Sequence, residues 1–232
     1  MGKIKLDSRL NAVASLIRPG SVIADIGTDH GYLICYLLEK GVCHKGIAAD
    51  LRKGPLENAE QTVLSCGLQD RVRLILSDGL MNIEENSCDE IVIAGMGGIL
   101  ISEIIEKAKW VYDKNIHIIA QPMTHAEYFR RFLCENGFVI EKEVTATDSK
   151  RHYCVISCYY DGVKKDYPES YYYLGELLKN KDEITLKYIE KMLFALEKKL
   201  DAQKKASIKD SDNLEKLITE IKLEISKAGI YD

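Results

Sequence analysis

Short apolar runs alternate with amphipathic stretches along the first 160 residues, and this alternation constrains the fold more than any other feature. Five runs have the length of strands, and a helical pattern follows each of them: Val22–Ile26, Gly46–Asp50, Val72–Leu76, Glu90–Ala94 and Ile116–Ala120. This order predicts an α/β, Rossmann-like domain with a doubly wound parallel sheet. Two further runs, Val139–Thr145 and Tyr153–Tyr159, are separated by a turn and predict an antiparallel pair at the edge of the sheet.

After Pro168 the sequence becomes rich in Lys, Glu and Leu and takes on a helical pattern. Apolar residues recur at helical spacing in two stripes, the first Leu178, Ile189, Leu193, Leu196 and Leu200, the second Leu214, Ile218, Ile221 and Ile225. Neither helix is long enough to be stable alone in water, so we expect an antiparallel, coiled-coil hairpin. We therefore divide the chain into a Rossmann-like domain at 1–160 and a helical coiled-coil domain at 161–232.

The composition argues against several classes of protein. The longest uncharged stretch is the twelve residues Ile91–Ser102, shorter than the roughly 18 to 20 apolar residues of a membrane-spanning helix. No signal sequence is visible, and seven cysteines without a C-x-x-C pair fit neither a disulfide framework nor a zinc site. We expect a cytoplasmic protein without a metal ion, and we favour a monomer. With a net charge of −4, any nucleic acid would have to bind at a local basic patch.

The first predicted strand ends in a turn of small residues that spans Asp25–Tyr32. Ligands bind at the carboxyl ends of strands in open parallel sheets, and small residues there let backbone amides approach them. A nicotinamide dinucleotide fingerprint would need glycine where Asp29 and Tyr32 stand, so a pyrophosphate is disfavoured in this turn. A carboxylate suits a cationic ligand instead, and Asp25 can accept a hydrogen bond from the ammonium group of an amino acid.

Acidic residues also close the next two strands. Asp50 can accept hydrogen bonds from both ribose hydroxyls of a nucleotide, a role that dinucleotide and adenosyl-cofactor enzymes share. Asp78 can accept a hydrogen bond from the exocyclic amine of an adenine. Each aspartate alone could equally cap the helix that follows it, but three in register predict a binding site for S-adenosylmethionine.

The fourth and fifth strands bring further groups to the same edge. Ala94–Gly98 contains three glycines, which either expose backbone to a ligand or allow close packing of the next helix. Gln121 ends the fifth strand with an amide beside a proline. The predicted cofactor contacts are Asp25, Gly27, Asp50, Leu51, Ser77, Asp78, Gly79, Gly95 and Met96.

An ordered set of motifs resembles the bacterial TrmK family of tRNA adenine-N1 methyltransferases, which modify the adenine at position twenty-two of tRNA. The motifs are Leu6–Leu10, Asp25–Leu33, Ser77–Leu80, Ala94–Gly98, Gln121-Pro122 and Arg151–Tyr153. The resemblance covers residues 6–160 and implies a class I methyltransferase fold, S-adenosylmethionine as methyl donor and N1-methyladenosine in tRNA as product. The family also carries a C-terminal coiled-coil hairpin, which residues 170–228 match only in periodicity.

Adenine N1 has an in-plane lone pair that can attack a sulfonium methyl group in line, without a metal ion or a covalent intermediate. Methylation leaves a positive charge on the base, which a neighbouring carboxylate would stabilise. We predict that Asp29 supplies this carboxylate, with a role as helix N-cap as the alternative. His30 and Tyr32 are predicted to stack on or hydrogen-bond the target base, with packing of Tyr32 beside Tyr36 on one helix face as the alternative. Gln121 and Arg151 are predicted to contact the substrate as well.

Two groups of basic residues could contact tRNA phosphates. The alternative is ordinary surface charge for the first group, and a dimerisation or packing role of the hairpin for the second. The first lies near strand ends and termini: Lys3, Lys5, Arg9, Arg52, Lys53, Arg130, Arg131, Lys150 and Arg151. The second lies at one end of the hairpin: Lys198, Lys199, Lys204 and Lys205.

Two other functions stay open on the sequence alone. A nicotinamide-dependent oxidoreductase is disfavoured by Asp29 and Tyr32 in the glycine turn. A non-catalytic adaptor with a Rossmann fold and a coiled-coil interaction domain would differ from an enzyme in failing to bind S-adenosylmethionine.

Overall fold

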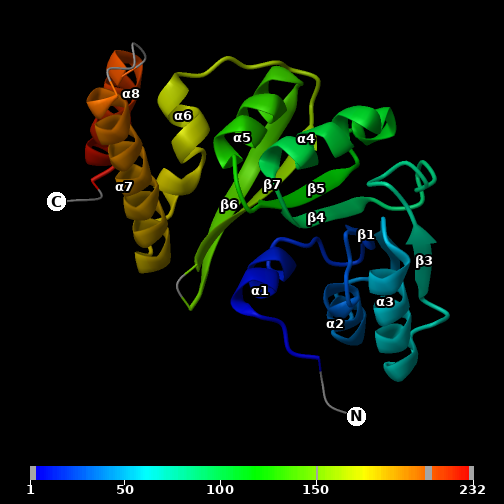
Figure 1. The fold of residues 1–232 in the computed structure, drawn as a ribbon. Helices are drawn as coiled ribbons and strands as arrows, with labels where there is room; N and C mark the ends of the chain where they lie inside the picture. The colour runs from blue at the N-terminus through cyan, green and yellow to red at the C-terminus, as the bar shows by residue number, and fades with distance from the viewer. Residues whose placement is uncertain (1–3, 150, 207–210, 230–232) are drawn as a thin grey trace.

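The computed structural model of the chain describes residues 4–149, 151–206 and 211–229, and within them it contains one seven-stranded sheet (Figure 1). The strands are β1 Val22–Ile26, β2 Lys45–Asp50, β3 Val72–Leu76, β4 Glu90–Met96, β5 His117–Pro122, β6 Phe138–Asp148 and β7 Arg151–Tyr160. They lie in the order β3-β2-β1-β4-β5-β7-β6, and the first five are parallel. The Rossmann-like α/β fold expected from the sequence is confirmed.

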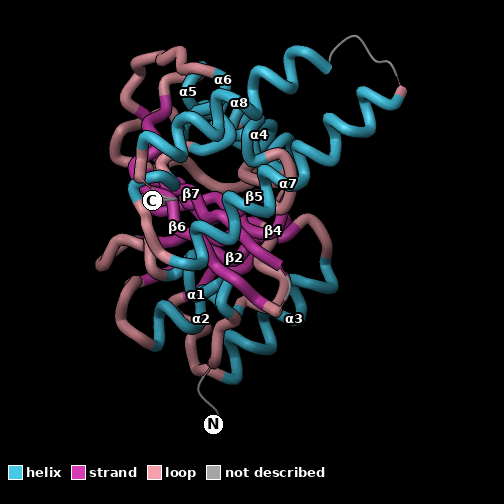
Figure 2. The backbone as a smooth tube through the Cα atoms, turned by 90° about the vertical axis from the view of Figure 1, so that its left-hand side faces the viewer, coloured by secondary structure: helices cyan, strands magenta, loops and turns pink. Residues whose placement is uncertain are grey.

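Helices cover both faces of the sheet (Figure 2). They are α1 Ser8–Ala14, α2 Tyr32–Glu39, α3 Lys53–Ser65, α4 Gly98–Lys107, α5 Ala126–Glu135, α6 Glu169–Leu174, α7 Glu183–Lys205 and α8 Ser211–Lys227, with 3-10 turns η1 Lys109–Val111 and η2 Leu177–Lys179. Residues of β1 alternate between two apolar cores, with Ile23 facing α1–α3 and Ala24 and Ile26 facing the other helices. Because both faces are buried, the strands appear in the sequence as continuous apolar runs.

Strand β7 pairs antiparallel with both β5 and β6, so that β6 forms the edge of the sheet. The expected antiparallel pair is confirmed, but β6 extends beyond Val139–Thr145 to Asp148, which pairs with Arg151. Backbone hydrogen bonds continue into this polar tip because pairing does not require apolar side chains. The hairpin tip therefore projects past the carboxyl end of β5.

The C-terminal helices α7 and α8 pair in antiparallel fashion. Lys204 Nζ at the end of α7 lies 2.9 Å from Glu215 Oε1, and Lys222 Nζ on α8 lies 2.6 Å from Glu197 Oε1. The end of α7 and the start of α8 project beyond the rest of the molecule (Figure 2). Leu178 lies in η2 and not on α7, so its place in the first stripe is wrong. The coiled-coil character of the pair stays a prediction.

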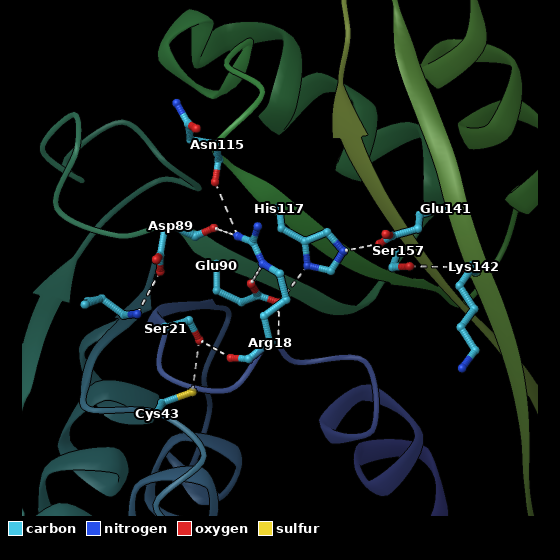
Figure 3. A network of polar contacts seen from close by, with 11 residues as sticks. Arg18, Ser21, Cys43, Asp89, Glu90, Asn115, His117, Glu141, Lys142 and Ser157 are labelled. Carbon is cyan, nitrogen blue, oxygen red and sulfur yellow. Dashed lines mark hydrogen bonds and ion pairs between the residues drawn. The ribbon is translucent and has the colours of Figure 1, made fainter.

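A charged network at the amino edge of the sheet accounts for two buried polar residues (Figure 3). Glu90 at the start of β4 is fully buried, and its two oxygens lie 2.7 Å from Arg18 Nε and 2.7 Å from His117 Nδ1. The other ring nitrogen of His117 lies 3.2 Å from Glu141 Oε2. This network joins the loop before β1 to β4, β5 and β6, at the edge of the sheet opposite the carboxyl ends.

A buried ion pair joins the C-terminal helices to the sheet. Arg130 on α5 is 1% exposed and donates through Nε to Glu143 Oε1 on β6 at 2.7 Å. Its Nη1 donates at 3.0 Å to the carbonyl groups of Tyr172 and Tyr173, while the backbone N–H of Glu176 donates to Glu143 Oε2 at 2.7 Å. Burial raises the pKa of Glu143, and Arg130 opposes that shift. Arg130 is thus a structural residue, and its place among the phosphate contacts is wrong.

We expect the substitution Arg130→Met to lower the free energy of unfolding by about 3–5 kcal/mol, because it leaves Glu143 buried without its partner. Urea unfolding followed by circular dichroism measures the change. The control is Arg73→Met, because Arg73 forms an exposed pair with Glu84 at 3.3 Å and should cost less than about 1 kcal/mol. Equal effects of the two substitutions would contradict the structural role of Arg130.

Candidate active site

Two adjoining pockets open at the carboxyl edge of the sheet. The strand-end pocket has a volume of about 450 Å³, and the predicted site residues that line it are Gly27, Asp29, Asp50, Leu51, Ser77, Asp78, Gly79, Gly95 and Met96. The turn pocket has a volume of about 200 Å³, and the predicted site residues that line it are Asp25, Gly27, Asp29, His30 and Tyr32. The two pockets share Arg9, Gly27, Asp29 and Ala94. The structure thus brings together all the predicted cofactor contacts and the three predicted base contacts from the first turn.

Asp25 is a buried carboxylate at the floor of the turn pocket. It is 6% exposed, and Thr28 Oγ1 donates a hydrogen bond to its Oδ2 at 2.8 Å. Burial raises the pKa of Asp25 to about 6, while the Thr28 hydrogen bond and the positive charge of Arg9 oppose the shift. A cation bound beside Asp25 would favour the ionised carboxylate.

Asp50 and Ser77 organise the strand-end pocket. Asp50 is 6% exposed at the end of β2, and its Oδ1 accepts a hydrogen bond from the backbone N–H of Arg52 at 2.9 Å. Ser77 Oγ donates to the carbonyl group of Gly79 at 2.9 Å and accepts from the backbone N–H of Asn82 at 3.0 Å. These bonds hold the loop that presents the exposed side chain of Asp78.

None of the aspartates at the strand ends caps a helix. Helix α2 begins after Gly31 and α3 after Arg52, and neither N-cap makes a side-chain hydrogen bond. No helix lies between β3 and β4 among the described residues, so the helical pattern predicted after Val72–Leu76 is wrong there and Asp78 has no helix to cap. The capping alternative, which included Asp29 for α2, is therefore wrong, and these carboxylates remain available to ligands.

Two of the residues that line the strand-end pocket are glycines with a left-handed backbone, Gly27 and Gly95. Gly27 has φ of +77°, and a Cβ atom on it would lie 2.5 Å from Met96 Cε. Gly95 has φ of +83°, and a Cβ atom on it would lie 3.4 Å from Arg9 Nη1. Both positions have a left-handed backbone, which glycine adopts without strain. At Gly27 a side chain would also collide with Met96.

Asp29, His30 and Tyr32 form the mouth of the turn pocket. Asp29 has φ of +54°, and its exposed carboxylate lies 3.7 Å from His30 Nε2. The rings of His30 and Tyr32 stack with centroids 5.2 Å apart, and Tyr32 is 45% exposed. The pair offers a flat aromatic surface next to a carboxylate.

Gln121 and Arg151 line neither pocket. Gln121 is completely buried, and its Oε1 accepts a hydrogen bond from Arg9 Nη1 at 3.2 Å. Arg9 stands at the junction of the pockets, whereas the sequence places it only among the possible phosphate contacts. Arg151 is exposed at the start of β7, near the hairpin tip. Lys3 and Lys150 lie outside the described residues.

Metal-ligand clusters and membrane-spanning helices were both sought among the described residues. No group of three His, Cys, Asp or Glu side chains there could hold a metal ion. No helix there combines the length and the apolar character that crossing a membrane requires.

Several known proteins are similar to this chain in sequence and in fold. Residues 6–156 match the model of a methyltransferase domain family. The tRNA (adenine(22)-N(1))-methyltransferase of Bacillus subtilis (strain 168) is 36% identical over 156 residues, which are 67% of this chain and 66% of that protein. The crystal structure of TrmK from B. subtilis superposes with a TM-score of 0.82 at 28% identity, covering 97% of this chain and 99% of that one.

A second solved structure, M. capricolum TrmK in complex with S-adenosyl-homocysteine, superposes with a TM-score of 0.79 at 26% identity, covering 95% of this chain and 98% of that one. Both structures extend the likeness through the C-terminal helices, beyond the segment that matches the curated B. subtilis protein. The resemblance to TrmK that the motifs indicate is confirmed, and the chain belongs to the methyltransferase domain family.

Proposed function

We propose that this protein is an S-adenosylmethionine-dependent methyltransferase that modifies N1 of an adenine in tRNA, at position twenty-two. The observation that carries the proposal is the convergence of Asp25, Asp50 and Asp78 on two adjoining pockets at the strand ends. The B. subtilis relative, 36% identical, is named for this reaction. Neither the oxidoreductase nor the adaptor alternative gains support from the relatives.

The residues of the pockets fit S-adenosylmethionine. Its ammonium group, ribose hydroxyls and adenine amine are hydrogen-bond donors, and the strand ends present three carboxylate acceptors: Asp25, Asp50 and Asp78. The same carboxylates would repel a pyrophosphate. Gly27 and Gly95 line the strand-end pocket and carry no side chain, so a ligand there can contact their backbone.

Bound S-adenosylmethionine would supply a methyl group on a positively charged sulfur. The chain would hold and orient the two partners of the transfer. Asp50 would accept the ribose hydroxyls and Asp78 the adenine amine, while Met96 and Leu51 would form apolar walls. Asp25 would hold the ammonium group at the turn.

Asp29 is the group that we propose to act on the target adenine. It lines both pockets, its carboxylate is exposed, and it caps no helix. We propose that it accepts a hydrogen bond from the amino group of the base and stabilises the positive charge that methylation creates. The stacked rings of His30 and Tyr32 would support the base at the mouth of the turn pocket.

Helix α7 carries a face that suits tRNA. Lys187, Lys191, Phe194 and Lys198 follow at spacings of four, three and four residues, and Phe194 is 66% exposed. Burial lowers the pKa of His152 on β7, and the charges of Lys191 and Lys187 lower it further, so this face adjoins the β6–β7 hairpin. Lysines around an exposed aromatic ring can contact phosphates and stack on a base. We propose that this α7 face binds tRNA. An ion pair does not separate it from the helix end, because Lys187 pairs with Glu183 just as Lys204 pairs with Glu215.

We further propose that the protein works as a monomer in the cytoplasm. The large apolar side chains exposed on the helical pair are Ile184 and Phe194 on α7, ten residues apart, and Leu223 on α8. Single exposed apolar residues of this kind are normal on a monomer.

Methyl transfer tests the proposed function directly. We expect the purified protein to transfer label from methyl-labelled S-adenosylmethionine to bacterial tRNA, and nucleoside analysis to identify N1-methyladenosine. A tRNA with guanine in place of the adenine at position twenty-two should accept no label. Label in another nucleoside, or in the control tRNA, would contradict the assignment of the target.

We expect Asp29→Ala and Asp29→Asn to slow single-turnover methylation by about 100-fold to 1,000-fold, the scale seen when one preorganised transition-state partner is removed. Affinity for S-adenosylmethionine, measured by calorimetry, should stay within about twofold because other residues hold that ligand. Near-normal methylation would remove Asp29 from the reaction. An equal loss of binding and rate would place it in the cofactor site.

We expect the triple substitution Lys187→Ser, Lys191→Ser and Lys198→Ser to weaken tRNA binding and to reduce its salt dependence. The log–log slope should fall by about 0.7 to 0.9 for each phosphate that the protein no longer neutralises. Methylation at saturating tRNA should not change. Lys45→Ser is the control, because Lys45 is exposed at the amino end of β2, on the edge of the sheet away from the pockets.

Point substitutions suit this test better than truncation, since Leu177, Ile189 and Leu193 share an apolar core with the sheet. Unchanged tRNA affinity in the triple variant would contradict the role of this face.

A further inference from the structure

A further pocket adjoins the turn pocket and has no role in the proposed function. It lies between the segment before α1, helix α2 and the tip of the β6–β7 hairpin, and its volume of about 730 Å³ exceeds that of the turn pocket and of the strand-end pocket. We call it the N-terminal pocket. Asp7 lines both this pocket and the turn pocket, so the two are neighbours.

Hydrogen bonds fix the wall that the segment before α1 contributes. Asp7 is the N-cap of α1, and its Oδ1 accepts a hydrogen bond from the backbone N–H of Leu10 at 2.7 Å. The side-chain amide of Asn11 donates to the carbonyl groups of Leu6 and Asp7, both at 2.9 Å. Ile4 and Leu6 pack against the apolar core that α2 also contributes to. The N-terminal pocket is therefore a formed part of the surface.

Two tyrosines on α2 connect the pockets. Tyr36 follows Tyr32 by four residues, so the two side chains are neighbours on one face of the helix. Tyr32 lines the turn pocket and Tyr36 the N-terminal pocket. Four helical residues advance about 6 Å along the axis, nearly twice the roughly 3.4 Å between bases stacked in a duplex strand. A strand with one base at Tyr32 and the next at Tyr36 is therefore unstacked, which is the state that exposes adenine N1.

The charges of the N-terminal pocket suit a whole nucleotide better than a phosphate group alone. The pocket is lined by two cations, Lys5 and Lys40, and by three carboxylates, Asp7, Glu39 and Asp148. The lysines can neutralise a phosphate, whereas the carboxylates would repel one but accept hydrogen bonds from the amino groups of a base. Lys40 Nζ lies 5.8 Å from the centre of the Tyr36 ring. An aromatic ring beside a cation binds single-stranded nucleic acid by stacking on a base.

The N-terminal pocket also lies between the α7 face and the turn pocket. Strand β6 contacts both α1 and α7, and the tip of the β6–β7 hairpin lies between these two helices (Figure 1). Asp148 at the tip lines the N-terminal pocket, while the charges of Lys187 and Lys191 on α7 act on His152. A tRNA strand held on the α7 face therefore crosses this tip to bring a base to the turn pocket.

We propose that the N-terminal pocket binds the nucleotide next to the target adenine, with its base stacked on Tyr36 and its phosphate beside Lys5 and Lys40. The inference rests on the proposed function, because it requires a target base in the turn pocket. Packing in the core does not account for Tyr36 fully, since its side chain is only half-buried and lines the pocket.

Three tRNA transcripts test the stacked base. The first is unmodified, and each of the others lacks the base but keeps the sugar and phosphate on the 5′ or on the 3′ side of the target adenine. We expect Tyr36→Leu to lower kcat/KM for methylation of the unmodified tRNA by about fivefold to a hundredfold, the scale of one base stacked on an aromatic ring. On one of the two abasic tRNAs the substitution should change kcat/KM by less than about twofold, because the partner of Tyr36 is already missing. Tyr36→Phe should match the wild type, since phenylalanine also stacks.

Tyr159→Leu is the matched control. Tyr159 is also half-buried, but it pairs with His117 at the amino edge of the sheet, so kcat/KM should not change on any of the three tRNAs. The affinity of Tyr36→Leu for S-adenosylmethionine should stay within about twofold, and thermal unfolding shows that each variant is folded. Lys40→Ser alters only an exposed side chain of the pocket and should raise KM for the unmodified tRNA without lowering kcat.

An equal decrease on all three tRNAs in Tyr36→Leu would overturn the inference. Unchanged kcat/KM of Tyr36→Leu on the unmodified tRNA, or unchanged KM in Lys40→Ser, would overturn it as well. If the wild-type protein methylated no tRNA, the proposed function itself would fail.

Discussion

The parallel pairing of β1 with β2 on one side and β4 on the other is the constraint on which the rest of the structure depends. Chain order reverses at β1, so the loops after β1 and β4 leave toward opposite faces and a crevice opens between them. Backbone bonds tie neighbouring strand ends at this crevice. Gly27 and Thr28 donate their N–H groups to the carbonyl group of Ala49 at 2.8 and 3.0 Å, and Ser77 donates to that of Asp50 at 2.9 Å. The three carboxylates are not in register as the sequence predicts, because Asp25 pairs with Ala48 and Asp50 with Leu76. The backbone bonds nevertheless hold all three at the same edge of the sheet.

Asp25 shows that this edge is built for binding more than for stability. Burial raises its folded-state pKa from 3.8 to about 6, so the unfolded chain releases this proton at lower pH than the folded chain. The folded state therefore binds more protons between about pH 4 and pH 6, and the contribution of Asp25 to stability falls as pH rises through that window. A cationic ligand would offset the cost by favouring the ionised carboxylate. A buried carboxylate that lowers the stability of the free protein, and that a bound cation would stabilise, is typical of a functional site.

Two arginines from distant parts of the chain connect the outer helices to the sheet. Arg9 brings α1 to the end of β5 through Gln121, and Arg130 brings α6 to β6 through Glu143. Helix α5, which carries Arg130, begins four residues after Pro122, the partner of the Gln121 amide. The active edge and the C-terminal helices are therefore attached to opposite ends of one short β5–α5 segment, and one apolar core runs through both. The α7 face proposed to bind tRNA is attached to the sheet through that same apolar core.

The sequence by itself determined the fold class, the order of the strands along the chain and the acidic residues at their ends. These features depend on local patterns: strands buried on both faces need apolar runs, and the carboxyl ends of parallel strands share one edge. What the tertiary structure alone decided is where the long polar side chains point. Arg9 and Arg130 have the same local character in the sequence, yet one enters a pocket and the other is buried against Glu143, thirteen residues away. Gln121 is predicted to contact the substrate, and in the structure it is completely buried and accepts a hydrogen bond from Arg9, a residue 112 positions away. Such partners come into contact only when the chain has folded. The local pattern of one segment contains no information on which distant segment will pack against it.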